Sequence, residues 1–140
     1  VVTLQYAIGR RISAANIRPL MTVATLFFIL GLGGFMISGE NLIYWGIAAA
    51  VFTLGEIIYA PGEYMLIDNI APPGMKASYF SAQALGWLGA AANPMITGII
   101  LTNLPHWSLF VIMMVAIVIA WLMILRGMSV KAWCEEPKVA

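Results

Sequence analysis

The stretch WSLFVIMMVAIVIAWLMIL, residues 107–125, decides the class of this protein, because it contains no charged residue over the length that a membrane-spanning helix needs. About 20 consecutive apolar residues cross the hydrocarbon core of a bilayer. Three further mostly apolar segments have a similar length: residues 19–38, 44–68 and 78–102. Residues 1–9 resemble the last turns of a truncated helix. The sequence therefore predicts an all-α membrane protein with about four transmembrane helices plus the end of a fifth.

The composition supports lipid as the solvent for most of the chain. Hydrophobic residues make up 62% of the sequence and charged residues only 9%, and the mean hydropathy is +0.94. A soluble domain of this length needs more polar surface to cover its core. The single cysteine, Cys134, excludes a disulfide framework and fits a free thiol. We therefore expect the lipid bilayer to be the main partner.

Several classes of chemistry find no support in the sequence. It contains no GxxxxGK[ST] phosphate loop, no spacing of His, Cys and Asp typical of a metal site, and a lone His106 without a catalytic partner. A net charge of +1 gives no reason to expect a nucleic-acid partner. We expect no enzyme activity, no catalytic residue, no metal and no cofactor.

The basic residues predict the orientation of the helices. Lys and Arg favour cytoplasmic loops, because translocating them during insertion is unfavourable. The opposite loops carry only Glu40 and His106. We therefore expect a multi-pass protein of the cell (inner or plasma) membrane, in which residues 127–140 form a cytoplasmic tail. The basic residues that fall on one side under this threading are Arg10, Arg11, Arg18, Lys76, Arg126, Lys131 and Lys138.

Glu56 is the most informative residue for function. It lies midway between Tyr44 and Asp68, roughly 18 Å from each along a helix and so near the bilayer midplane. A carboxyl group at that depth is costly in lipid, so it should face a cavity or a partner, where it can bind and release a proton. The alternative is a permanently protonated Glu56, or one paired with a polar group elsewhere in the protein.

Further polar and small residues accompany Glu56. Glu63 and Tyr59 share its helical face, and Pro61 and Gly62 predict a kink and a close helix approach there. Glu63 and Asp68 are nearer the cytoplasmic side and could pair with Arg10, Arg11 or Lys76. On the next helix Asn93 reaches a similar depth, where a hydrogen bond to Glu56 is one possibility. On the same helix, Gln83 is a further polar candidate for proton or substrate binding. The residues expected to kink this helix or allow close helix packing are Gly86, Gly89, Pro94 and Gly98.

The order of these residues resembles helices ten and eleven of major facilitator superfamily transporters, and is most similar to the drug:proton antiporter branch. The opening Gly9-Arg10-Arg11 resembles the cytoplasmic gating loop between helices eight and nine. The resemblance implies that the chain is part of a six-helix half. The residues that carry it are Gly55-Glu56, Pro61, Ala71-Pro72, Lys76, Ser78-Tyr79, Gly86, Gly89, Asn93-Pro94 and Gly98.

This resemblance implies a secondary active transporter that works by alternating access, with proton-coupled efflux of small molecules or drugs. Its partners would be a small-molecule substrate, protons and the N-terminal half of the same transporter. The helix of Glu56 would line the central cavity, and the next helix would pack against the other half. Two alternatives stay open. One is a proton-coupled oligopeptide or other solute symporter of the same superfamily, and the other is a self-contained four-helix membrane protein that acts as an oligomer.

Overall fold

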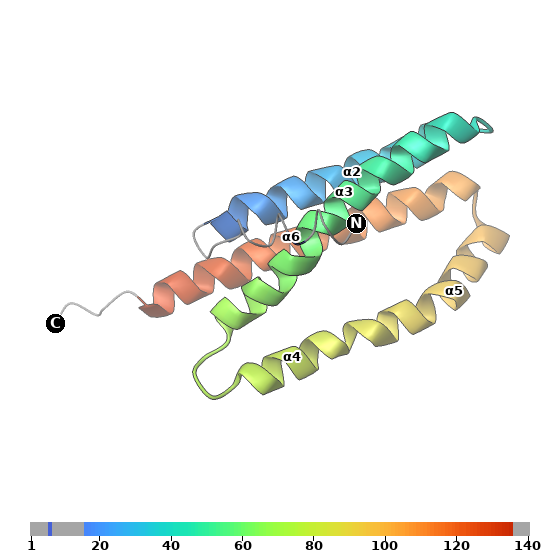
Figure 1. The fold of residues 1–140 in the computed structure, drawn as a ribbon. Coiled ribbons are helices and arrows are strands. Elements are labelled where there is room, and N and C mark those ends of the chain that lie inside the picture. Colours follow the sequence, from blue (N-terminus) through green and yellow to red (C-terminus); the bar gives the residue numbers. More distant parts are fainter. Residues whose placement is uncertain (1–5, 7–15, 136–140) are drawn as a thin grey trace.

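The computed structural model describes Tyr6 and residues 16–135. Within residues 16–135 the chain forms α-helices joined by short turns, as Figure 1 shows. The helices are α2 (Ile17–Ile37), α3 (Leu42–Ile70), α4 (Lys76–Ala84), α5 (Gly86–Asn103) and α6 (His106–Glu135).

Four segments of the described chain are long and apolar enough to cross a membrane, as predicted. They are Ile17–Ile37, Leu42–Ile70, Lys76–Asn103 and His106–Ser129, with α4 and α5 together forming the third. The all-α fold class is thereby confirmed. The predicted helix end at residues 1–9 lies outside the described residues, except for Tyr6.

Local sequence explains where these helices begin and end. Asn41 caps α3, because its side-chain Oδ1 accepts a hydrogen bond from the Ile43 N–H at 3.0 Å. Gly39 has a φ of +52° and Gly74 a φ of +84° in the turns before α3 and before α4, a backbone region that glycine enters without strain. Pro105 directly precedes α6, a position where its missing N–H costs the helix nothing.

Two helix boundaries differ from the sequence prediction. The third span is interrupted at Leu85. The Leu85 N–H donates a hydrogen bond to the Ala82 carbonyl at 3.1 Å, and the Leu85 carbonyl accepts one from the Leu88 N–H at 3.0 Å. These shorter-range bonds tighten the turn next to Gly86, a residue that favours the helix weakly. The fourth helix does not end near residue 125 but continues to Glu135. Part of the segment expected as a tail, residues 127–135, is therefore helical.

The described core lies between α2, α3 and the C-terminal part of α6. Ile17, Met21 and Leu66 form its buried centre. Glycines allow α2 and α3 to approach closely: an added Cβ at Gly31 would lie 2.8 Å from Phe52 Cβ, and one at Gly34 would lie 2.8 Å from Ala48 Cβ. Small residues at such positions are the usual means of close helix packing in membranes.

Helices α4 and α5 pack least. Neither contains a buried residue, and Figure 1 shows them set apart from the α2 and α3 pair. Figure 1 also shows that the N-terminal end of α2, the start of α4 and the C-terminal end of α6 lie at one end of the molecule. Arg18, Lys76 and Arg126 belong to these segments. The described basic residues that the threading grouped together thus share one end.

Candidate functional site

The candidate site is an open groove of about 450 Å³ on the α2 and α3 pair. Of the described residues, Phe28 of α2 forms part of its wall and residues of α3 form the rest. The α3 residues that line it are Phe52, Glu56, Ile57, Tyr59, Ala60 and Glu63.

Helical spacing explains why α3 presents these groups together. Glu56, Tyr59 and Glu63 follow each other at intervals of three and four residues, which places them on one helical face. Glu56 is the central residue of the helix Leu42–Ile70. Its neighbours Gly55 and Ile57 are buried against the bundle, whereas Glu56 is exposed. The groove therefore holds a carboxyl group at the midpoint of a spanning helix.

Aromatic rings form the wall of the groove beside this carboxyl group. The Phe28 and Phe52 ring centroids lie 4.9 Å apart, and Phe28 and Tyr59 meet edge to face at 5.8 Å. Sequence reasoning missed Phe28 and Phe52. Phe52 could have been found, because it precedes Glu56 by one helical turn on the same face. Phe28 could not, because its place depends on how α2 packs against α3.

Neither carboxyl group of the groove pairs with a cation of the described residues. At the basic end, Asp68 of α3 forms an ion pair with Lys76 at the start of α4. This is one of the pairings that the sequence analysis considered. Glu63 is half-buried and Glu56 is exposed. The predicted gating residues Gly9, Arg10 and Arg11 lie outside the described residues.

The polar residues of the third span lie apart from the groove. Gln83 is half-buried on α4, and Asn93 is exposed on α5, where its Oδ1 accepts a hydrogen bond from Thr97 Oγ1 at 3.2 Å. The α3 and α5 helices make no contact. The hydrogen bond between Glu56 and Asn93 that the sequence analysis considered is therefore not formed.

The glycines and prolines singled out from the sequence fall into two groups. Gly62 of α3 is buried, and a Cβ added there would collide with Met21 Cε of α2. By contrast, a Cβ at Gly86, Gly89 or Gly98 would meet nothing within 4 Å. Pro61 and Pro94 lie inside helices that continue through them. The glycines of α5 are therefore free to receive another helix, whereas Gly62 already packs within this chain.

Within the described residues, no cluster of His, Cys, Asp and Glu could hold a metal ion. The groove offers carboxyl groups together with apolar and aromatic contacts to a bound molecule.

The sequence of the chain is similar to those of two known proteins. Over 133 residues, or 95% of this chain, the sequence is 64% identical to the MFS-type transporter YdeE of Escherichia coli (strain K12). The chain is thus similar to part of an MFS-type transporter. MFS denotes the major facilitator superfamily, the family that the sequence resemblance indicates. A second relative, the MFS-type transporter YqjV of Bacillus subtilis (strain 168), is 38% identical over 48 residues, or 34% of this chain.

The chain spans 34% of the length of YdeE and 12% of that of YqjV. The similarity therefore concerns part of each relative. No family model matches the chain, and no solved structure matches it. Similarity to membrane transporters agrees with the four spanning segments of the described chain.

Proposed function

We propose that this chain is part of a proton-coupled secondary transporter of the major facilitator superfamily, which exports small molecules by alternating access. The observation that carries the proposal is the exposed Glu56 at the centre of α3, in a groove with no described cation beside it. Similarity to two MFS-type transporters supports the transporter part of this proposal.

The physical argument starts from the cost of a carboxyl group in lipid. A charged side chain near the bilayer centre costs at least about 2.5 kcal/mol, so such residues face a cavity or a partner and commonly serve transport or proton relay. Glu56 points out of the helix pair. Its face should therefore border a water-filled pathway in the assembled transporter.

Substrate transport is coupled to proton transport when one carboxyl group binds either the proton or the substrate. When the groove opens to the side of higher pH, Glu56 releases its proton and the carboxylate can bind a cation. When the groove opens to the side of lower pH, protonation removes the charge and the cation leaves. The rings of Phe28, Phe52 and Tyr59 favour a lipophilic or aromatic cation, because such ligands gain from ring faces as well as from the carboxylate.

The exposed face of α4 and α5 suits the N-terminal half of the transporter as a partner. Neither helix has a buried residue, and Gly86, Gly89 and Gly98 leave room for close approach of another helix. We further propose that the end bearing Arg18, Lys76 and Arg126 faces the cytoplasm of a cell membrane.

Flux measurements with the full-length protein in liposomes test the direction of coupling. With an imposed pH gradient, an exporter of lipophilic cations should move ethidium against the proton flow and should leave a dipeptide unmoved. Dipeptide uptake together with protons, without ethidium movement, would instead favour the symporter alternative. If the flux of either probe did not depend on the pH gradient, the proposal of proton coupling would be wrong.

A further inference from the structure

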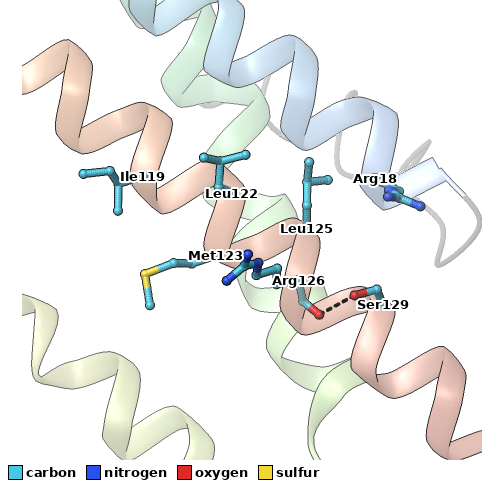
Figure 2. Close-up of a pocket in the computed structure, with 7 residues that line it drawn as sticks. All are labelled: Arg18, Ile119, Leu122, Met123, Leu125, Arg126 and Ser129. Carbon is cyan, nitrogen blue, oxygen red and sulfur yellow. Dashed lines mark hydrogen bonds between the residues drawn. The ribbon is translucent and has the colours of Figure 1, made fainter.

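A second site lies away from the groove, at the basic end between α2 and α6. The pocket has a volume of about 490 Å³, and Figure 2 shows the described residues of α2 and α6 that line it. The residues are Arg18 of α2 and Ile119, Leu122, Met123, Leu125, Arg126 and Ser129 of α6.

The polar rim of this pocket carries two positive charges. Arg18 and Arg126 are both exposed, and neither forms an ion pair with a residue in the described part of the chain. The Ser129 hydroxyl adds no free donor, because it donates to the Arg126 carbonyl at 2.7 Å. Guanidinium groups bind phosphate oxygens through paired N–H donors. The rim is therefore suited to a phosphate group.

The remaining walls are apolar. Ile119, Leu122 and Met123 are exposed side chains on the turns of α6 that precede Arg126. Arg126 lies 20 residues after His106, the first residue of α6. That interval corresponds to about 30 Å of helix, the thickness of the hydrocarbon core, so the apolar walls lie in the acyl region and the two arginines at its boundary.

We propose that this pocket binds an anionic phospholipid, with its headgroup at the end that bears Arg18 and Arg126 and an acyl chain along Ile119, Leu122 and Met123. A soluble anion would use only the rim, whereas a lipid satisfies the charged rim and the apolar walls together. Basic pockets between transmembrane helices are a known way of holding anionic lipid headgroups. This site shares no residue with the groove of Glu56, so it does not depend on the proposed transport mechanism.

Native mass spectrometry of the delipidated full-length protein, titrated with defined lipids, tests the site. Phosphatidylglycerol and cardiolipin should bind in preference to phosphatidylcholine. Arg18→Gln and Arg126→Gln should each weaken phosphatidylglycerol binding by about fivefold, in line with the contribution of one basic residue near an anionic membrane surface. Lys76→Gln is the matched control, because Lys76 lies at the same end but is paired with Asp68. It should leave binding within about twofold.

Three outcomes would overturn the proposal. One is equal retention of phosphatidylcholine and phosphatidylglycerol by the wild-type protein, a comparison that requires no variant to fold. Another is a loss of phosphatidylglycerol binding in Lys76→Gln as large as that in Arg126→Gln, which would indicate that anionic lipid is attracted to the basic surface in general. The last is displacement of the lipid by millimolar inorganic phosphate, which would indicate a free-anion site.

Discussion

The indole Nε1 of Trp121 donates a hydrogen bond to Thr22 Oγ1 at 3.2 Å, and so links α6 to α2 across the bundle. The Thr22 hydroxyl in turn donates to the carbonyl of Arg18 at 3.1 Å. This short chain of hydrogen bonds fixes α6 beside the first turn of α2. It therefore holds the two helices that carry Arg18 and Arg126 in the relative position that forms the basic pocket.

Replacing Trp121 with Phe should weaken this link without removing the aromatic ring. Hydrogen bonds between membrane helices contribute about 0.6 kcal/mol on average, so we expect a loss of that order in the free energy of unfolding. Unfolding of the reconstituted full-length protein by a denaturing detergent measures it. Trp87→Phe is the control, because Trp87 is 77% exposed on α5. Equal losses for the two variants would contradict a structural role for the Trp121 hydrogen bond.

The close contact of α2 and α3 gives a sharper stability test. A Cβ at Gly31 would lie 2.8 Å from Phe52 Cβ and 3.0 Å from its backbone, whereas a Cβ at Gly33 would meet nothing within 4 Å. Gly31→Ala should therefore force the helices apart and lower the free energy of unfolding by about 1–3 kcal/mol. Gly33→Ala, two residues away, should be neutral or slightly stabilising. If the two variants were equally stable, the described packing of α2 on Phe52 would be wrong.

The ion pair between Asp68 and Lys76 should contribute little. The two side chains are 54% and 52% exposed, respectively, and exposed pairs typically contribute less than about 1 kcal/mol. Asp68→Asn and Lys76→Gln should each change stability by less than that amount, and the double variant should match either single one. A loss of several kcal/mol in detergent unfolding would show instead that the pair is buried in the assembled protein.

Membrane orientation can be tested by labelling single cysteines. In a full-length background with Cys134→Ser, Lys76→Cys and Ser129→Cys should react with a membrane-impermeant maleimide from the same side, and Glu40→Cys from the other. The reason is that Lys76 and Ser129 lie toward the basic end of the bundle, while Glu40 lies in the turn between α2 and α3. Labelling of Lys76→Cys and Ser129→Cys from opposite sides would contradict the threading.

Much of the fold could be predicted because it depends on local properties of the chain. The four spans follow from the length of each apolar run, and the turns between them follow from residues such as Gly39, Asn41 and Pro105. The possible pairing of Asp68 with Lys76 could be foreseen for the same reason, since the two residues flank one short connection.

The rest depends on how helices distant in the sequence pack together. The aromatic wall requires α2 to place Phe28 against Phe52, and the basic pocket requires Arg18 to lie beside the end of α6. The sequence of one segment alone does not determine how α2 packs against α3 or against α6. The separation of Asn93 from Glu56 has the same origin, because equal depth in the membrane does not make two helices neighbours.

Proton coupling through Glu56 is tested by comparing Glu56→Gln with Glu40→Gln in the full-length protein. Liposomes with an imposed pH gradient would report ethidium flux for both variants and for the wild type. Loss of the titratable carboxyl group in the groove should reduce proton-driven flux by about tenfold or more and remove its dependence on pH. Loss of the Glu40 carboxyl group, in the turn before α3, should change neither. Wild-type flux with wild-type pH dependence in Glu56→Gln would show that Glu56 does not couple transport to protons.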